Sequence, residues 1–398
     1  MVYQNLLIIV SFILIFSLFS IRIEKTGISG PILALIIGLV FGPLILDLFD
    51  MTLEGEEYRT IAELALALVL FTDASKTNLT MLEKNSKMPI RLLLIGLPLT
   101  IIFGLIGGYL LFKGFTWIEA GILATMLAPT DAALGKAVVT NKAVPSKIRE
   151  ALNIESGLND GISVPVLFLF IALFTTQSGD GLSSLYGLKL LAKEIGIGLL
   201  AGLAITFIIV WIAHFSTKRN WITESWQPMV IITLSFTCFT VAQIAGGSGF
   251  IACFAGGFLF GTINNKFDLK MNLLDSAEGF GDTISLVTWL IFGSLIITEF
   301  FPEFTWEVVI YAVLSLTIIR MVPVFLSLFN TGMSAKEKIF MGWFGPRGLA
   351  TIVFAIMVVD VQLPHKSTII ITVVCTIMLS VILHGFTANP FIKMLNKK

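Results

Sequence analysis

The sequence has few charged residues, few cysteines and few histidines, and each shortage excludes a class of protein. Only 13% of its 398 residues are charged, about half the share of a typical soluble domain. With 56% hydrophobic residues and a mean hydropathy of +0.94, a water-soluble fold could not bury its apolar side chains. The composition also excludes a disordered chain and a basic nucleic-acid-binding protein. It predicts a polytopic helical membrane protein.

The residue types that most often hold metals or form disulfides are scarce. The three cysteines all lie in apolar stretches: Cys238, Cys253 and Cys375. They predict neither a disulfide framework nor a metal site, and we expect no cofactor. The three histidines lie near the ends of apolar stretches: His214, His365 and His384. We expect interfacial or packing roles for them rather than proton relays.

Apolar stretches long enough to cross a bilayer recur along the whole chain. A bilayer core needs roughly 20 apolar residues per helix, and windows of about that length predict thirteen membrane spans. Their approximate cores are residues 4–21, 28–46, 60–80, 90–112, 117–137, 147–175, 188–213, 226–244, 249–263, 275–298, 305–329, 337–359 and 367–391. Because most connections are short, we expect a single all-α transmembrane unit over residues 1–398, without a soluble regulatory domain.

Lysine and arginine are distributed unevenly over the connections between these spans. If the N-terminus lies outside, every inside connection is basic, whereas two of the outside connections are rich in acidic residues. Positive residues concentrate in cytoplasmic loops. The sequence therefore predicts a multi-pass protein of the cell (plasma) membrane, with its N-terminus outside and its C-terminus in the cytoplasm.

A few ionisable residues remain inside the predicted spans. Four acids lie well within them: Asp73, Asp131, Glu155 and Asp160. Two arginines accompany them: Arg320 and Arg347. A charged side chain at the bilayer centre costs about 2.5–3.5 kcal/mol on insertion scales, and such residues mark ion or substrate pathways. Because the acids outnumber the arginines, the set favours the binding of protons or cations, or exchange of one for the other. The alternative is a set of buried ion pairs that stabilise helix packing.

Proline interrupts two of the predicted spans at corresponding places. Pro129 lies in the fifth span two residues before Asp131, and Pro346 lies in the twelfth span directly before Arg347. Each proline removes a backbone donor and clashes with the preceding turn. Interrupted helices at matching positions of two halves indicate a transporter site, where unwound backbone exposes carbonyls to a cation. The halves would be spans 1–6 and 8–13, related as inverted repeats.

The sixth span carries polar side chains at helical spacing. Ser156 and Asp160 share one face of the helix, and Glu155 and Asn159 share a neighbouring face. The first face offers a hydroxyl and a carboxylate, and hard cations prefer such oxygen ligands. The second face offers a carboxylate that could pair with an arginine and an amide that can brace a neighbouring group.

Three motifs, taken in order, resemble the NhaP branch of the cation/proton antiporter 1 family, prokaryotic Na⁺/H⁺ antiporters related to animal Na⁺/H⁺ exchangers. They are Pro129-Thr130-Asp131, Glu155-Ser156-Gly157-Leu158-Asn159-Asp160 and Gly345-Pro346-Arg347-Gly348. The resemblance runs over the whole chain. It implies electroneutral exchange of one Na⁺ (or Li⁺) for one H⁺ by elevator-type alternating access, both ions competing for one carboxylate site. A K⁺/H⁺ antiporter of the same fold is the alternative.

The resemblance also implies a role for each residue of the site. Asp160 would be the carboxylate that carries the cation or the proton. Asp131, the Ser156 hydroxyl and the Thr130 main-chain carbonyl would be further ligands of Na⁺. Asn159 matches the asparagine that stands where electrogenic relatives have a second aspartate, which is why the resemblance implies electroneutral exchange.

Further residues and the assembly follow from the same resemblance. Glu155 would pair with a buried arginine, Arg320 in the first place, while Arg347 matches the arginine of the broken twelfth helix. Asp73 matches an acidic position near the cytoplasmic entrance, although its neighbours depart from the family pattern. Family members are homodimers in which a core domain (spans 3–6 and 10–13) moves against a dimerisation domain (spans 1–2 and 7–9). The expected partners are membrane lipids and a second copy, with no nucleic acid and no obligatory protein partner.

Two other classes of protein compete with this interpretation. Residues 279–282 fit the GxGD pattern of intramembrane aspartyl proteases, which also need a Tyr-Asp pair on another helix. None of the five tyrosines is followed by aspartate, so we expect no enzyme. A channel would need a continuous pore, whereas surplus buried carboxylates on broken helices favour a saturable carrier.

Overall fold

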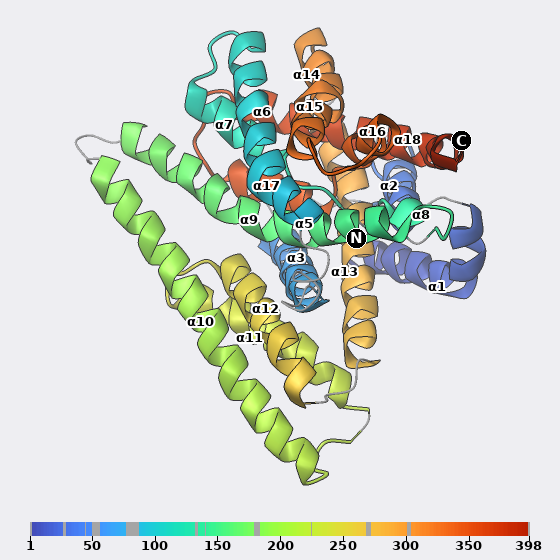
Figure 1. The fold of residues 1–398 in the computed structure, drawn as a ribbon, viewed down its shortest axis with the longest axis vertical. Helices are drawn as coiled ribbons and strands as arrows, with labels where there is room; N and C mark the ends of the chain where they lie inside the picture. Colours follow the sequence, from blue (N-terminus) through green and yellow to red (C-terminus); the bar gives the residue numbers. More distant parts are fainter. Residues whose placement is uncertain are drawn as a thin grey trace. The chain divides into compact units, whose positions relative to one another are not determined.

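A computed structural model describes residues 2–26, 29–43, 45–49, 56–76, 87–131, 134–139, 141–178, 184–223, 225–267, 272–300 and 304–396. All regular secondary structure in these residues is helical (Figure 1). Seven of the helices are long and apolar enough to cross a membrane, and shorter apolar helices lie between them. The described residues divide into two compact units.

The first unit contains residues 1–61, 87–159 and 285–398. Its helices are α1 (Val2–Thr26), α2 (Gly30–Phe41), α5 (Lys87–Arg91), η1 (Leu92–Gly96), α6 (Leu97–Leu111), α7 (Trp117–Met126), α8 (Lys136–Val139), the first part of α9 (Ser146–Ser178), the last part of α13 (Asn272–Phe300), α14 (Trp306–Leu316), α15 (Ile318–Ser327), α16 (Ala335–Trp343), α17 (Leu349–Val359) and α18 (Lys366–Asn396). Helix α18 packs against α7, α14, α16 and α17. This unit therefore contains both spans that the sequence predicts to be broken.

The second unit contains residues 62–86 and 160–284. Its helices are most of α3 (Glu56–Lys76), the second part of α9, α10 (Ser184–Lys218), α11 (Gln227–Ile244), α12 (Gly249–Phe267) and the first part of α13. Helices α10, α11 and α12 pack against one another (Figure 1).

Glycines let the helices of the second unit approach closely. Gly202 on α10 lies against the main chain of Ala252 on α12, with no room for a Cβ atom. Gly257 and Gly261, one turn apart on α12, lie in the same way against the main chain of Phe71 and Ser75 on α3. Small residues at this spacing allow backbone-to-backbone packing in apolar surroundings.

The two proline-containing spans are interrupted where the sequence predicts. Helix α7 ends at Met126, and residues 127–131 lie outside any helix before the short helix α8. Helix α16 ends at Trp343, and residues 344–348 are not helical before α17 begins at Leu349. The predicted span 337–359 is thus two half-helices.

A third interruption was not predicted. The stretch 305–329 reads as one apolar span, but α14 ends at Leu316 and α15 starts at Ile318. Thr317 separates them with φ −110° and ψ −96°, and its hydroxyl donates to the main-chain oxygen of Val313 at 2.6 Å. Threonine that bonds back to the preceding turn in this way bends helices. No proline or glycine marks the place, so sequence patterns alone pass over it.

Candidate functional site

Asp131 joins the first interruption to the second. Its main-chain N–H donates to the Pro346 oxygen at 2.8 Å, so the two unwound stretches bond directly. Its carboxylate Oδ2 accepts from the N–H of Leu349 at 3.0 Å, and Oδ1 accepts from Leu134 N–H at 3.3 Å. Leu349 is the first residue of α17. A negative charge at this position neutralises the positive end of a helix dipole.

Arg347 makes the reciprocal connection from the second interruption to the first. Its Nη1 donates to the main-chain oxygens of Ala128 and Pro129 at 3.0 and 3.1 Å, directly after α7 ends. Its Nη2 donates to the oxygen of Ser315 at 3.3 Å. The residue is fully buried. The guanidinium therefore satisfies carbonyls that the unwound chain leaves open, near the negative end of α7.

Two glycines make room for the charged groups at the second interruption. A Cβ atom on Gly348 would overlap the Asp131 carboxylate, and a Cβ atom on Gly345 would overlap the Arg320 guanidinium. Neither glycine has a positive φ angle. Their role is thus to leave space for the two charged groups rather than to permit a backbone conformation closed to other residues.

Glu155 and Arg320 form a buried ion pair. Oε1 of Glu155 on α9 lies 2.9 Å from Nη1 of Arg320 on α15. The residues are 4% and 3% exposed. Removing one partner of such a pair leaves an uncompensated charge and costs about 3–5 kcal/mol. The pair ties α9 to the helix that follows the interruption at Thr317.

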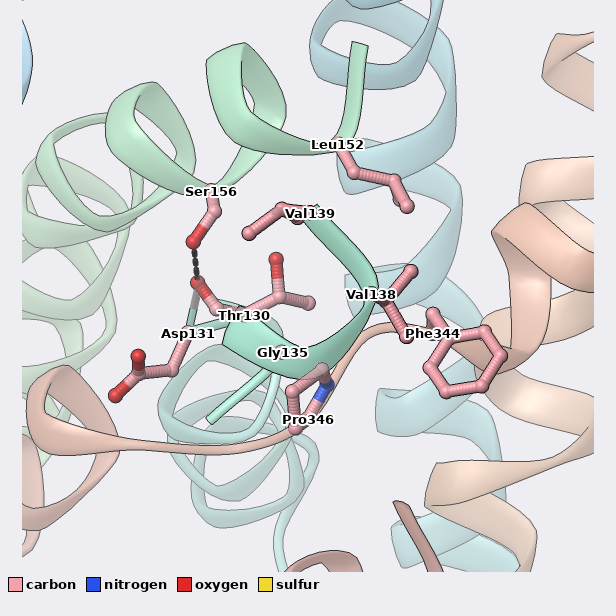
Figure 2. Close-up of a pocket in the computed structure, with 9 residues that line it drawn as sticks. All are labelled: Thr130, Asp131, Gly135, Val138, Val139, Leu152, Ser156, Phe344 and Pro346. Atoms are coloured by element: carbon pink, nitrogen blue, oxygen red, sulfur yellow. Dashed lines mark hydrogen bonds between the residues drawn. The ribbon is translucent and has the colours of Figure 1, made fainter. Parts of the chain in front are cut away.

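Helix α9 also holds the first interruption in place. The Ser156 hydroxyl donates to the main-chain oxygen of Thr130 at 2.5 Å (Figure 2). Asn159 Nδ2 donates to the Thr130 hydroxyl at 2.7 Å. All three residues are buried. The two bonds fix both the carbonyl and the side chain of the residue that follows Pro129.

A small pocket lies beside these groups (Figure 2). It is lined by Thr130, Asp131, Gly135, Val138, Val139, Leu152, Ser156, Phe344 and Pro346. Its volume of about 10 Å³ is close to what a single water molecule needs. Its polar lining residues are Thr130, Asp131 and Ser156, and oxygen is the ligand type suited to a hard cation.

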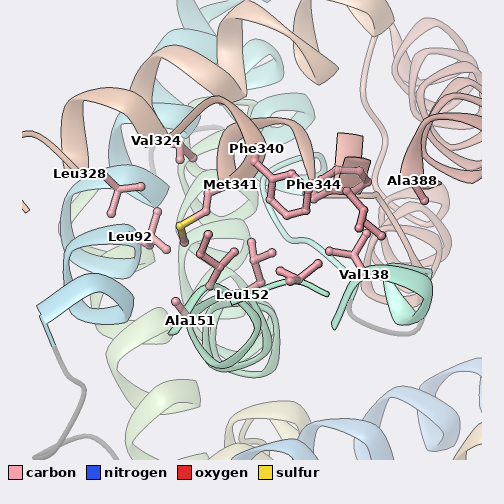
Figure 3. Close-up of a cluster of buried hydrophobic side chains, with 13 residues drawn as sticks. Leu92, Val138, Ala151, Leu152, Val324, Leu328, Phe340, Met341, Phe344 and Ala388 are labelled. Atoms are coloured by element: carbon pink, nitrogen blue, oxygen red, sulfur yellow. The ribbon is translucent and has the colours of Figure 1, made fainter. Parts of the chain in front are cut away.

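The other part of the pocket is apolar. Val138, Leu152 and Phe344 line it and belong at the same time to a larger cluster of buried hydrophobic side chains (Figure 3). This cluster draws residues from α8, α9, α15, α16 and α18. The pocket is therefore lined by polar residues together with apolar ones, and apolar surroundings strengthen electrostatic interactions.

The predicted site residues fall in both units. The first unit brings together seven of them: Thr130, Asp131, Glu155, Ser156, Asn159, Arg320 and Arg347. Asp160 and Asp73 belong to the second unit. Asp160 lies one turn after Ser156 on the continuous helix α9 and is 9% exposed. Asp73 lies on α3 and is partly buried.

Two residues of α18 that the sequence did not single out for this site contact the second interruption. The N–H of Arg347 donates to the Ser380 hydroxyl at 2.9 Å, and Nε2 of His384 lies 2.8 Å from the Trp343 oxygen. His384 is buried, which fits a packing role rather than an interfacial one, the two roles that the sequence left open for it. The spacing of Ser380 and His384, four residues apart as in Ser156 and Asp160, was the available signal.

Comparison with known proteins assigns the chain to a family. Residues 9–394 match the family described as sodium/hydrogen exchanger, transmembrane. A Na⁺/H⁺ antiporter of Schizosaccharomyces pombe is 24% identical over 426 residues, which cover 98% of this chain and 90% of the relative. The K⁺/H⁺ antiporter NhaP of Alkalimonas amylolytica is 24% identical over 388 residues, which cover 95% of this chain and 65% of the relative.

The fold has a counterpart among solved structures. The sodium proton antiporter MjNhaP1 from Methanocaldococcus jannaschii matches with a TM-score of 0.77 and 21% identity, covering 98% of this chain and 97% of that one. The family is one of membrane transporters, so the protease interpretation of residues 279–282 no longer applies. The chain belongs to the family of transmembrane sodium/hydrogen exchangers, as its resemblance to the NhaP branch predicted, and it is a multi-pass transporter rather than an enzyme.

Proposed function

We propose that the protein exchanges Na⁺ (or Li⁺) for H⁺ across the membrane in an electroneutral 1:1 cycle. The observation that carries the proposal is the pocket at the crossing of the two interrupted spans. There Thr130, Asp131 and Ser156 line a small pocket, and the Ser156 hydroxyl bonds the unwound main-chain carbonyl of Thr130. Membership of the exchanger family and relatives named as Na⁺/H⁺ antiporters support the choice of ions.

The proposed cation ligands are Asp160, Asp131, the Ser156 hydroxyl and the Thr130 carbonyl. The hydroxyl now donates its proton to the Thr130 carbonyl. Each of these oxygens keeps a further lone pair, so both can accept a cation without first breaking their mutual bond. Protons compete with the cation for the Asp160 carboxylate, and the neutralised site then crosses to the other face of the membrane.

The charge balance of the site supports a 1:1 exchange. Glu155 and Arg320 neutralise each other, while Asp131 and Arg347 each neutralise the end of a half-helix. Asn159 contributes an uncharged amide. In this proposal Asp160 alone changes its charge state during the cycle, because it holds either one cation or one proton.

The architecture around this site is part of the proposal. We propose thirteen spans in two inverted six-helix repeats, with the N-terminus outside the cell membrane and the C-terminus in the cytoplasm. Spans 3–6 and 10–13 would form the moving core domain of an elevator-type carrier. Spans 1–2 and 7–9 would form the dimerisation domain of a homodimer embedded in lipid, and Asp73 would line the cytoplasmic entrance.

K⁺/H⁺ exchange is the second candidate. The similarity to the Alkalimonas amylolytica K⁺/H⁺ antiporter NhaP over 95% of this chain favours it. Both ions bind to oxygen ligands, so the ligand types do not separate the two functions. The choice depends on how tightly the pocket closes around a dehydrated ion.

Proteoliposomes with an imposed pH gradient test both candidates. Na⁺, Li⁺ and K⁺ are added in turn, with and without a clamped membrane voltage. We expect Na⁺ and Li⁺ to dissipate the gradient with saturation and without dependence on voltage. In the Asp160→Asn variant, exchange should be abolished although the folded dimer remains intact. Wild-type exchange in this variant would overturn the assignment of Asp160, and dissipation by K⁺ alone would establish the second candidate.

A further inference from the structure

Three polar side chains of helix α18 form hydrogen bonds with residues at the end of α16 and in the unwound stretch that follows it. The N–H of Arg347 donates to the Ser380 hydroxyl at 2.9 Å. Nε2 of His384 lies 2.8 Å from the main-chain oxygen of Trp343, and Nε1 of the Trp343 indole donates to the Thr387 hydroxyl at 2.9 Å. These residues of α18 lie four and three positions apart, so they share one face of the helix.

The bonds meet a need that the interruption creates. Where a helix is broken in a membrane, its last carbonyls and first N–H groups lose their helical partners and must find others. The N–H of Arg347 precedes α17, and the Trp343 oxygen belongs to the last residue of α16. Ser380 is 0% and His384 4% exposed, so water has little access to take their place.

The imidazole of His384 connects the two sides of this interruption. Its Nε2 lies 2.8 Å from the Trp343 oxygen, and its Nδ1 lies 3.1 Å from the Ser380 hydroxyl and 2.7 Å from the main-chain oxygen of Ser380, one turn back on α18. The Ser380 hydroxyl in turn accepts from the N–H of Arg347. The ring thereby links the residue after Pro346 to the end of α16.

The other interruption is held by the same arrangement. On α9, Ser156 bonds the residue that follows the first proline, and Asp160 lies one turn further on. On α18, Ser380 bonds the residue that follows the second proline, and His384 lies one turn further on. The histidine thus occupies on α18 the place that the proposed ion carrier occupies on α9.

We propose that His384 is a positioning residue for cation exchange. Through Ser380 and Trp343 it fixes the unwound stretch 344–348, which keeps the Arg347 guanidinium on the carbonyls of the opposite interruption and the start of α17 on the Asp131 carboxylate. This inference rests on the proposed function because it concerns the same site. His384 itself does not bind the ion.

Two substitutions separate hydrogen bonding from packing. His384→Phe keeps an aromatic ring beside the Trp343 and Phe344 rings, which lie 5.4 and 6.1 Å from the imidazole, but removes both polar atoms. His384→Gln keeps a donor and an acceptor but removes the ring. Partners that orient ligands of a bound ion typically change its affinity about 10-fold or more. We expect His384→Phe to raise the Na⁺ concentration for half-maximal exchange about tenfold, and His384→Gln to stay close to wild type. The opposite order would reduce His384 to a packing residue.

A second measurement does not depend on transport. Hydrogen exchange at the amides of residues 344–349 should become faster in His384→Phe and Ser380→Ala and remain slow in His384→Gln. Thr376→Val is the matched control, because its buried hydroxyl bonds within α18, to the Thr372 oxygen at 2.7 Å. It should change neither the amide exchange nor the Na⁺ dependence.

The two measurements distinguish failure of this inference from failure of the proposed function. If Asp160→Asn still exchanges ions while His384→Phe loosens residues 344–349, the ion ligand is wrong and the positioning role stands. If amide exchange in this stretch is the same in His384→Phe and wild type, the positioning role is refuted whatever Asp160 does.

Discussion

The two interrupted spans both leave backbone groups without helical partners, and residues of opposite charge bond some of these groups. The first interruption contributes exposed carbonyls and the Asp131 carboxylate, and the second contributes N–H groups and the Arg347 guanidinium. Each charged group bonds the backbone of the other span. The Asp131 carboxylate accepts from the first N–H of α17, and the Arg347 guanidinium donates to the carbonyls that follow α7. Each interruption thus satisfies some of the open backbone groups of the other. Either one can move only by carrying the other with it or by breaking these bonds.

Their supports differ in a way that relates to function. Helix α9 bonds the first interruption through Ser156 and Asn159 and continues with the acid Asp160. Helix α18 bonds the second through Ser380 and His384, and its described residues bring no acid to that place. In both helices a serine bonds the residue after a proline, but the residue one turn further on is an aspartate in α9 and a histidine in α18. This difference predicts that ion binding depends on α9, while α18 keeps the opposite stretch in position.

The largest expected effect concerns the pair that connects α9 to the second interruption. Glu155→Ala leaves the Arg320 guanidinium, which fills the space beside Gly345, as an unpaired charge in the interior. We expect the free energy of unfolding to fall by about 3–5 kcal/mol, measured as a lower melting temperature in detergent. The double variant Glu155→Leu/Arg320→Met removes both charges and should recover most of the loss. An unchanged melting temperature in Glu155→Ala would show that the pair does not stabilise the fold.

A smaller effect is expected where the two interruptions touch most closely. Gly348→Ala places a methyl group where the Asp131 carboxylate lies, so the carboxylate must leave the start of α17. We expect a loss of about 1–3 kcal/mol in stability and a weaker apparent affinity for Na⁺. Gly196→Ala on α10 is the control, since no atom lies within 4 Å of its added Cβ, and it should stabilise the helix by about 0.5–1 kcal/mol. Wild-type melting and Na⁺ affinity in Gly348→Ala would break the proposed link between the spans.

The sequence predicts the local events of this fold well. Pro129 and Pro346 mark both interruptions because proline removes a backbone donor and clashes with the preceding turn, although Pro165, Pro323 and Pro390 lie inside helices. The spacing of Ser156, Asn159 and Asp160 predicts which groups share a face of α9 because helical periodicity is local. The interruption at Thr317 escapes such reasoning, since threonine is common in apolar helices and bends them only in some contexts.

The partners across the crossing could not be read from the sequence. That Asp131 would bond Leu349, and Arg347 the oxygen of Pro129, depends on how segments more than 200 residues apart pack. The role of Gly345 could not be read from the sequence either. It precedes Pro346 at the interruption, and in the structure its missing side chain leaves room for the Arg320 guanidinium. For His384 the sequence left an interfacial and a packing role open, because the residue lies near the end of an apolar stretch; its helix continues to Asn396 and the side chain is buried.

The smallest expected effect distinguishes the role of the side-chain oxygen of Thr130 from the role of its main-chain oxygen. The Asn159 amide bonds the side-chain hydroxyl, whereas Ser156 bonds the main-chain carbonyl, the proposed ligand. Thr130→Val and Asn159→Ala should each lower stability by about 1 kcal/mol, the usual contribution of one hydrogen bond. Because they remove the same bond, the double variant should lose clearly less than the sum of the two. Exchange should persist in Thr130→Val, since the carbonyl remains.

The control for this cycle is Thr125→Val on α7, whose buried hydroxyl bonds the Gly121 oxygen within its own helix at 2.8 Å. Combined with Asn159→Ala, it should give additive losses, because the two residues share no bond. Additive losses in the Thr130 and Asn159 pair as well would mean that their contact contributes nothing to the fold. If Thr130→Val abolished exchange at wild-type stability, the hydroxyl rather than the carbonyl would be the cation ligand, and α9 would act on the ion through Asn159 as well as through Ser156.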